Sequence, residues 1–357
     1  MVAHRSDRRK AGTDRVRFRF HWSGFYTRDM NGLLALDDCL QRALAALEPV
    51  APVLQPCDEA IGAVLADDLL LPCDFPVRDE ALQAGLAVNS LDLVGAGADN
   101  PVPLTLARSV EPGQALPANT DAVLGDDGFD RSFGQTEALR AVHPGEGLRR
   151  AGHDGRSGDL LAPAGTRVSP RLALAATLAG YEQLPVRRPQ VALQLPHLPH
   201  NRLVAAWLQR TGATTTTAPA DLIICPTRSH RPGLALMPAE TAWLETTASG
   251  LLLSVPRRFD GLVCALLALA LPLLGRCSGA QPQQKTRPLA RKVSSALGLT
   301  ELVLLHTDGG DWAPSPPGTI TLTGLAGACA FALIPADSEG LAAGTTLTAT
   351  AIDQPFG

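Results

Sequence analysis

The chain has 357 residues, too many for one ordinary hydrophobic core, so the sequence predicts two or more domains. Hydrophobic residues make up 45% and charged residues 18%, which is typical of globular domains and argues against an extended disordered chain. The net charge of −4 conceals an asymmetry: residues 1–29 carry a net +5, which leaves −9 in the remainder. A mildly acidic body gives no reason to expect a nucleic-acid partner.

The spacing of the cysteines and the length of the apolar runs indicate the cellular compartment of the protein. Seven cysteines are scattered without a Cys-x-x-Cys pair, which favours reduced thiols in a cytoplasmic protein over a disulfide or zinc framework. The longest apolar run, Leu262 to Leu274, has 13 residues, fewer than the roughly 20 needed to span a bilayer. No membrane partner is expected, and the N-terminus lacks the apolar core of a signal peptide.

The first segment, residues 1–29, is rich in arginine and shows no helical periodicity. Two interpretations stay open. The segment is a disordered tail, or it precedes a true translation start at Met30. A nucleic-acid-binding arm is a less favoured third reading.

The next elements are predicted from the spacing of the apolar residues and from the Pro, Gly, Asn and Asp residues that interrupt them. Leucines recur at helical spacing within 33–47, and Pro49 ends the pattern. A second helix is predicted over Asp58–Leu69, with Asp58 as its N-cap. From 87 to 142, short apolar runs alternate with Gly, Pro, Asn and Asp, which predicts a β-rich region.

A strand and turn are predicted over Leu160–Pro170, followed by a helix that Ser169 caps. This helix is expected to run through Leu178 and to end at Gly180.

An alternating α/β section comes next, and its β-α-β-β-α order predicts a small doubly wound sheet. Asp260 is the predicted cap of the last helix. A polar, proline-bearing linker over Ser278–Pro288 separates this section from a β-rich small barrel or sandwich over Val293–Ile352. The predicted strands and helices are Val191–Leu195, Asn201–Thr211 ended by Gly212, Asp221–Cys225, Gly250–Val255 and Leu262–Leu274.

Several phrases, in this order and spacing, resemble the molybdopterin molybdenumtransferase family, also known as MoeA, whose eukaryotic relative is the E domain of gephyrin. The similarity extends over nearly everything from Leu33 to Ile352. The phrases are GAVLADDLLLPCDFP (Gly62–Pro76), VEPGQALPANTDAVL (Val110–Leu124), LRRAGHDGRSGDLLAPAGTRVSP (Leu148–Pro170), Asn-Arg-Leu at 201–203, ARKVSS (Ala290–Ser295) and ALIPADSEGLAAGTTL (Ala332–Leu347).

The resemblance implies an elongated, multidomain homodimer with α/β and β-rich modules, including a small doubly wound α/β domain and a C-terminal β-barrel-like domain. It also implies insertion of molybdate into adenylylated molybdopterin with Mg²⁺, so the expected cofactors are molybdopterin or molybdenum cofactor and Mg²⁺. The expected modules are 33–73 with 145–187 as a discontinuous N-terminal module, 74–144 as an inserted β-rich domain, 188–279 as a shortened α/β domain, and 288–353 as the C-terminal β domain.

The resemblance also points to candidate site residues. Asp154 matches a family acidic position and is the candidate catalytic residue, although the sequence around it favours an exposed turn aspartate. Weaker candidates for cofactor binding lie in turns and at helix starts. Among them, Arg257 and Arg258 either bind an anion between them or are two solvent-exposed loop residues. His197 and His200 have a spacing that could suit a metal, but no third ligand is evident and the metal ligands stay unknown. The weaker candidates are Gly113, Asn201, Arg202, Arg257, Arg258, Gly318 and Thr319.

The chain departs from the family pattern at many polar positions. A family aspartate falls on Ala84 and a family threonine on Pro112. Two family lysines fall on Met237 and Glu240, and the glycine of a strand-loop-helix corner falls on Arg257. An inverted charge opposes phosphate binding. The acidic loop and the glycine-pair loop of the α/β domain are replaced by QLPHLPHNRL and PTRSHRPG.

These departures leave three hypotheses. The chain is a non-catalytic relative that binds molybdopterin or molybdenum cofactor, or assembles with a molybdoenzyme or a cofactor-synthesis partner. Alternatively, it is an active molybdopterin molybdenumtransferase. The third hypothesis is a decaying gene. The sequence favours the first and leaves open whether the chain is an enzyme.

Overall fold

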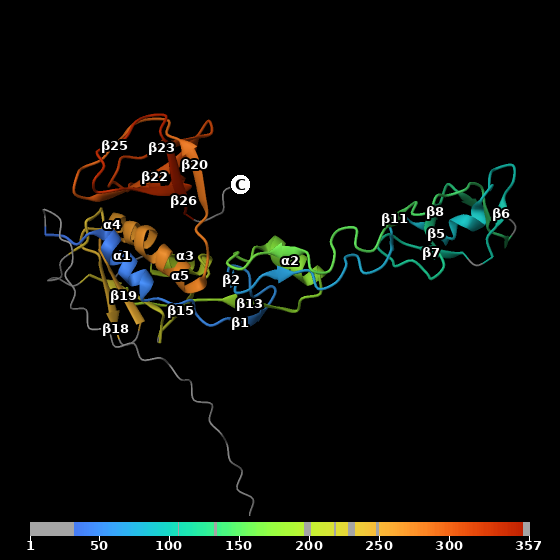
Figure 1. Cartoon of the computed structure of the whole chain (residues 1–357), viewed down its shortest axis with the longest axis horizontal. Coiled ribbons are helices and arrows are strands. Elements are labelled where there is room, and N and C mark those ends of the chain that lie inside the picture. Colours follow the sequence, from blue (N-terminus) through green and yellow to red (C-terminus); the bar gives the residue numbers. More distant parts are fainter. Residues whose placement is uncertain are drawn as a thin grey trace, which may run out of the picture. The chain divides into compact units, whose positions relative to one another are not determined.

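The computed structural model describes residues 32–105, 107–131, 134–195, 201–217, 219–227, 233–247 and 250–352. The segment 1–29 and the His197–His200 motif therefore lie outside the described residues. The chain divides into two compact units (Figure 1). Unit 1 comprises Met1–Val53, Gly62–Ala66 and Val186–Gly357, and unit 2 comprises Leu54–Ile61 and Asp67–Pro185.

The β-rich region predicted over 87–142 is confirmed in unit 2. Two three-stranded sheets enclose a small core that contains Leu86, Leu93 and Leu124. One sheet has the order β7 (Arg108–Val110), β5 (Gly85–Val88), β8 (Ala122–Gly125), and the other has the order β6 (Val102–Pro103), β10 (Glu137–Ala138), β9 (Phe129–Asp130). A short helix, η1 (Ser90–Leu93), follows β5.

The capped helix of unit 2 also forms as predicted. Helix α2 spans Pro170–Leu178, and the Ser169 hydroxyl accepts a hydrogen bond from the Leu172 N–H at 3.1 Å. Gly180 has φ 97°, a left-handed conformation that suits the end of a helix. Strand β12 (Leu160–Ala162) precedes the helix and pairs with β3 (Leu69–Leu70).

The helix predicted over Asp58–Leu69 is wrong. Residues 57–62 form turns, and β2 (Val64–Leu65) pairs antiparallel with β13 (Gln183–Arg187). Gly62 has φ 86°, which a right-handed helix cannot contain. Of the apolar residues that suggested a helical face, Val64, Leu65 and Leu69 instead occupy buried strand positions.

Unit 1 contains a five-stranded sheet. Its order is β15 (Thr214–Thr216), β14 (Gln190–Leu193), β16 (Leu222–Pro226), β19 (Gly250–Val255), β18 (Trp243–Thr247), and only β18 is antiparallel. Strands β14, β16 and β19 match predicted strands. Strands β15 and β18 were not predicted, because threonine-rich runs carry little apolar periodicity.

The helices described around this sheet pack on one of its faces rather than on both. Helices α1 (Leu36–Ala45), α3 (Asn201–Arg210) and α4 (Phe259–Ala265) share a single core with Leu222 and Leu251 (Figure 1). On the other face, Ala192, Ala220, Ile223 and Leu252 form a small cluster that contains no helix residue from the described ranges. A doubly wound sheet has helices on both faces, so the described part of this five-stranded sheet differs from the predicted doubly wound arrangement. The connection from β15 to β16, residues 217–221, is too short for a crossover helix.

Helix α4 continues through the π-helical turn η3 (Leu266–Ala270) into α5 (Leu271–Ser278). The resulting 20-residue helix, Phe259–Ser278, is longer than the 13-residue run in the sequence and is apolar enough to cross a membrane. However, 78% of its most apolar window is buried inside the protein, as expected for a core helix, so it is weak evidence for a membrane span.

Asp260 is not the cap of this helix, contrary to the prediction. Arg258 occupies the N-cap position with an extended backbone, and Asp260 lies in the first turn.

The C-terminal module of unit 1 closes into a small barrel. Sheet neighbours run β23 (Asp311–Pro314), β22 (Thr300–Asp308), β24 (Ala330–Ile334), β26 (Thr346–Ala351), β20 (Gln284–Pro288). A bridge between Leu289 and Trp312 joins β20 back to β23. Trp312 is fully buried inside this barrel, and its Nε1–H donates to the Leu347 carbonyl at 3.1 Å.

Candidate functional site

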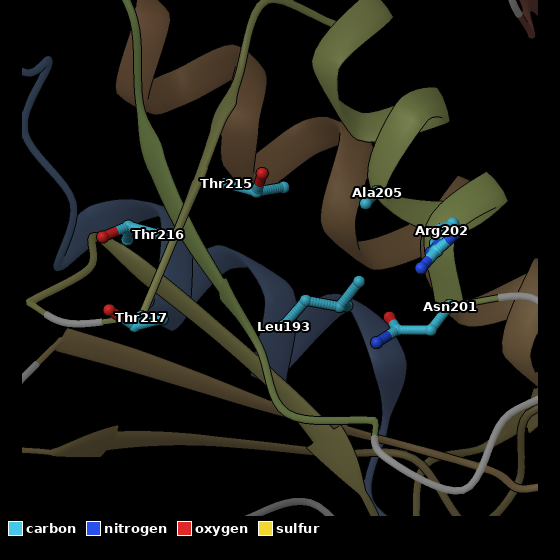
Figure 2. A pocket seen from close by; sticks show the side chains of 7 residues that line it. All are labelled: Leu193, Asn201, Arg202, Ala205, Thr215, Thr216 and Thr217. Carbon is cyan, nitrogen blue, oxygen red and sulfur yellow. The ribbon is translucent and has the colours of Figure 1, made fainter.

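A cavity of about 500 Å³ opens in unit 1 where β14 and β15 end and α3 begins. Asn201 and Arg202 lie at the start of α3, Leu193 ends β14, and 215–217 follow along β15 (Figure 2). The carboxyl ends of parallel strands and the following helix start are the usual place for a ligand in α/β folds.

The polar lining of this cavity suits an anion. Arg202 supplies a permanent positive charge, and Thr215, Thr216 and Thr217 supply hydroxyls. The side-chain oxygen of Asn201 is buried and has no hydrogen-bond partner among the described residues, so it calls for a hydrogen-bond donor on the ligand rather than for its negative charge. The Gln209 amide donates to the Thr215 hydroxyl at 3.1 Å, which links α3 to β15. The helix dipole at the start of α3 adds to the attraction for negative charge.

The same lining does not suit Mg²⁺. Magnesium in proteins is held by carboxylates, and no Asp or Glu from the described residues lines the cavity. Among the described residues, no three His, Cys, Asp or Glu side chains gather into a possible metal site. The described residues around this cavity therefore do not fit Mg²⁺.

The strand-loop-helix corner between β19 and α4 carries its own counter-ions. Arg258 donates to both carboxylate oxygens of Asp260, at 3.0 and 2.8 Å, and its other nitrogen lies 3.9 Å from Glu240. Burial alone would raise the pKa of Asp260, but the Arg258 and Gly261 hydrogen bonds hold it below its usual value. Arg258 is thus already neutralised, and Asp260 accepts the Gly261 N–H that an anionic ligand would otherwise use.

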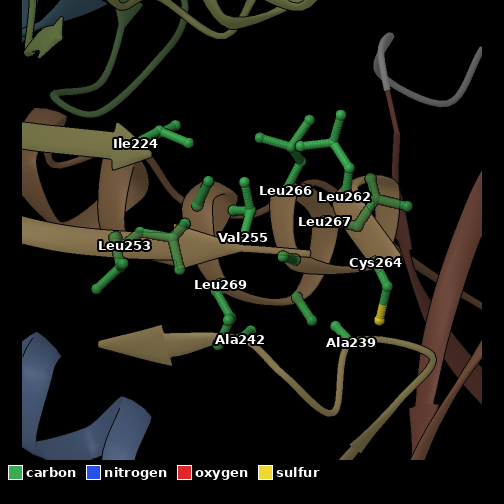
Figure 3. Packing of buried hydrophobic residues seen from close by; sticks show 14 of the residues in the cluster. Ile224, Ala239, Ala242, Leu253, Val255, Leu262, Cys264, Leu266, Leu267 and Leu269 are labelled. Carbon is green, nitrogen blue, oxygen red and sulfur yellow. The ribbon is translucent and has the colours of Figure 1, made fainter. Parts of the chain in front are cut away.

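The helix under this corner is packed tightly against its surroundings. Cys264 is buried beside Ala239 (Figure 3), and burial raises the pKa of its thiol well above the usual range. Gly261 is required at the corner because an added Cβ would lie 2.7 Å from the Pro256 side chain and 2.9 Å from the Pro238 carbonyl. The corner is therefore a packed connector with internal ion pairs.

The two candidates of the C-terminal module lie in a tight turn. Gly318 has φ 62°, and an added Cβ would lie 2.7 Å from the Met237 side chain. Its N–H donates to the Leu302 carbonyl at 3.0 Å, and the Thr319 hydroxyl contacts the Pro317 carbonyl at 3.4 Å. These contacts show that Gly318 and Thr319 have structural roles within the turn.

Asp154 belongs to unit 2 and is engaged by neighbours. It forms an ion pair with Arg149, which also lies 3.7 Å from Glu80, and its carboxylate is 3.0 Å from the His153 ring. Gly113, also in unit 2, has φ 82° in a turn where nothing lies within 4 Å of an added Cβ.

The structure thus brings together Asn201 and Arg202 in the cavity, and Arg257 with Arg258 at the α4 corner. Arg257 does not line the cavity. The threonines 215–217 were missed by sequence reasoning. The run of four threonines after Gly212 was the available signal, because it places hydroxyls at the end of a strand next to a helix start.

Comparisons with known proteins place the chain among molybdopterin-related proteins. Residues 34–180 match the model of the MoeA N-terminal region, domains I and II. A molybdopterin biosynthesis protein of Methanocaldococcus jannaschii is 30% identical over 122 residues, 31% of either chain. Molybdopterin molybdenumtransferase 2 of Mycobacterium tuberculosis is 27% identical over 165 residues, 41% of either chain. The chain spans about a third to two-fifths of these relatives, and the matched family region ends before the cavity.

The fold comparison extends further. The molybdopterin biosynthesis MoeA protein of Pyrococcus horikoshii superimposes with a TM-score of 0.66 at 20% identity. The match covers 90% of this chain and all of that one. A Pyrococcus furiosus molybdenum cofactor biosynthesis protein gives a TM-score of 0.56 at 15% identity. At these identities the similarity shows a common fold.

Proposed function

Because the chain is a member of the MoeA family, we propose that it works in molybdenum cofactor biosynthesis as a protein that binds molybdopterin or its metal-loaded cofactor. In this proposal it delivers or assembles the cofactor, and its capacity to insert molybdate is impaired or lost. The observation that carries the proposal is the cavity at α3. The part of its lining that the structure describes has cationic and hydroxyl groups for a phosphate and no carboxylate for a metal.

The division between binding and catalysis follows from physical chemistry. A phosphate-bearing pterin can be held by an arginine and hydroxyl donors at a helix start. Molybdate insertion also needs charge stabilisation where the adenylate phosphate is cleaved. The α4 corner supplies little of this, because Arg258 is held by Asp260 and Glu240.

We expect Arg202→Ala to weaken molybdopterin binding about tenfold or more, because a hydrogen bond to a charged group contributes about 1.5–3 kcal/mol. Isothermal titration of the purified chain with molybdopterin measures this. Arg210→Ala, at the opposite end of α3, is the matched control and should leave the affinity unchanged. Equal affinities for the native chain and the Arg202 variant would refute the cavity as the binding site.

The alternative function is an active molybdopterin molybdenumtransferase that inserts molybdate into adenylylated molybdopterin. The family relationship favours it. It requires groups outside the α4 corner to stabilise the reacting phosphate and to hold Mg²⁺. Turnover of adenylylated molybdopterin distinguishes it from the favoured proposal.

We also propose that the chain is a homodimer in the cytoplasm. All seven cysteines are free thiols, as a reducing compartment allows. On α2 of unit 2, Leu174 and Leu178 are 62% and 59% exposed on one helical face, and the cross-strand pair Leu70 and Leu160 is also exposed. Exposed apolar side chains at this spacing favour a protein contact. A partner molybdoenzyme or cofactor-synthesis protein is a further expectation of this proposal.

Replacing both Leu174 and Leu178 by arginine should convert the dimer to a monomer, because an interface does not bury unpaired charge without cost. Light scattering after gel filtration gives the mass directly. Leu297→Arg, at an exposed leucine of unit 1, should remain dimeric. A native chain that is monomeric at micromolar concentration would overturn the dimer.

A further inference from the structure

Acidic residues are concentrated in one module of unit 2. Residues 74–144 contain eleven Asp or Glu against four Arg and no Lys, a net charge of −7 in a chain whose total is −4. A module with this charge attracts basic partners at long range and repels acidic ones, and both effects weaken as salt is added.

The same module contains a pocket of about 290 Å³, which we call the η1 pocket. Residues of η1 form one side of it, and residues 141–144 form the other. Its buried members are Ser90 and Val142, and Val142 belongs to the small hydrophobic core of the module. A side chain that enters the η1 pocket therefore reaches that core. The volume is small for a cofactor and suits one or two side chains.

Two large apolar side chains border the η1 pocket and remain in contact with solvent. Leu91 and Val94 are 74% and 75% exposed, among the largest exposures of apolar side chains in the described residues. They are three residues apart, the spacing at which side chains of a 3₁₀-helix lie on the same side. Paired apolar side chains beside a pocket indicate a place where another apolar group docks.

Both sides of the η1 pocket are held in place by Asp121. Its carboxylate accepts hydrogen bonds from the N–H and the hydroxyl of Ser90, each at 2.7 Å. Its carbonyl accepts the Gly145 N–H at 2.8 Å, directly after the other side of the pocket. The Asn89 side chain also accepts the Leu91 N–H at 3.0 Å. The pocket is therefore formed in the free protein, and a ligand does not have to order a loop in order to bind.

Uncompensated carboxylates flank the η1 pocket. Asp92 lies within η1 and is exposed, and it has no ion-pair or hydrogen-bond partner among the described residues. The same holds for Asp99, which is exposed next to Asn100. The Asn100 amide donates to the carbonyl of Gly95, a residue that lines the pocket, at 3.1 Å. The η1 pocket therefore has an apolar centre and a negatively charged rim.

We propose that the η1 pocket binds a basic linear segment of a partner protein, in which arginine or lysine flanks one large apolar side chain. The apolar side chain enters between η1 and residues 141–144, and the flanking cations face Asp92 and Asp99. Apolar burial supplies the affinity, and the charges supply orientation and rate. The charge of the module disfavours an acidic partner. This interaction does not depend on the function proposed for the cavity at α3.

A peptide array probed with the full-length chain tests this proposal. The probes are pentapeptides Ser-Arg-X-Arg-Ser, in which X is each amino acid in turn, and a matching set with Glu in place of Arg. We expect X = Trp, Phe or Leu to bind at least about fivefold more strongly than X = Gly, and only between the arginines. Raising the salt from about 50 to about 500 mM should weaken this binding. No preference for a large apolar X, or equal binding of the two sets, would overturn the proposal.

Variants at exposed positions locate the binding. Leu91→Asp combined with Val94→Asp should weaken binding of a fluorescent Ser-Arg-Trp-Arg-Ser peptide at least about fivefold, measured by anisotropy. Both substitutions add negative charge, which alone favours a basic peptide, so a loss of affinity reports the apolar contact. Leu82→Asp, at an exposed leucine of unit 2 that does not line the pocket, is the matched control. Equal affinities for the double variant and the control would refute binding at this pocket.

A charge reversal on the rim separates recognition from a loss of folding. Asp92→Lys should weaken binding of the arginine peptide and strengthen binding of Ser-Glu-Trp-Glu-Ser, a reversal that an unfolded module cannot produce. Affinities that fall together for both peptides would count against the charged rim. Light scattering of the Leu91 and Val94 double variant tests a different occupant. A mass unlike that of the native chain would show that a second copy covers the pocket, and would overturn the proposal.

Discussion

Trp312→Ala is expected to destabilise the C-terminal barrel by about 3–5 kcal/mol, the range measured when large aromatic side chains are removed from cores. Trp312 is fully buried, its Nε1–H donates to the Leu347 carbonyl, and the Arg287 guanidinium lies 4.9 Å from the centre of its ring. It also forms the bridge that closes the barrel. The substitution leaves a large cavity and removes the hydrogen bond from the Trp312 Nε1–H.

Urea denaturation followed by circular dichroism measures this change, because a tryptophan fluorescence signal would be altered by the substitution itself. Leu297→Ala, at a mostly exposed position of the same module, should change the free energy of unfolding by less than about 0.5 kcal/mol. A loss below about 1 kcal/mol for the Trp312 variant would show that the barrel does not depend on this side chain.

Glu240→Lys is expected to create an anion site at the start of α4. In the native chain Glu240 and Asp260 hold Arg258, so the helix start presents little net positive charge. The substitution changes the local charge by two units and leaves Arg258 with one carboxylate instead of two. Even when solvent screens the charges, affinity for pyrophosphate should rise at least about tenfold, equivalent to about 1.4 kcal/mol.

Isothermal titration with pyrophosphate compares the native chain, Glu240→Lys and Glu111→Lys. The last variant makes the same change of net charge in unit 2 and should bind pyrophosphate no better than the native chain. If the native chain already binds pyrophosphate at α4 as tightly as the Glu240 variant, then Glu240 and Asp260 do not prevent Arg258 from binding an anion.

Much of the fold could be predicted from local signals. The α2 helix was predicted correctly because Ser169 and Gly180 mark its two ends by well-defined chemistry. Strands β16 and β19 were identifiable as short apolar runs. The false helix over Asp58–Leu69 arose because a short apolar pattern does not distinguish a helix from strand pairs distant in sequence. Only the pairing of Val64 and Leu65 with β13 decides it.

The site was less predictable for a physical reason. Asn201 and Arg202 could be placed at a helix start, but their meeting with Thr215–Thr217 depends on β15 lying beside β14. The neutralisation of Arg258 by Glu240 likewise joins residues from two separate loops. A family pattern can show that a lysine is lost at position 240, but it does not show that the glutamate there pairs with this arginine.

Release of AMP from adenylylated molybdopterin, with Mg²⁺ and molybdate present, tests the central proposal most directly. The measurement is made on the purified chain next to an intact family member, with molybdopterin binding confirmed in the same preparation. The account predicts that the chain binds molybdopterin and releases AMP at least a hundredfold more slowly, about 2.7 kcal/mol of lost transition-state stabilisation. Release at the rate of the intact enzyme would contradict it.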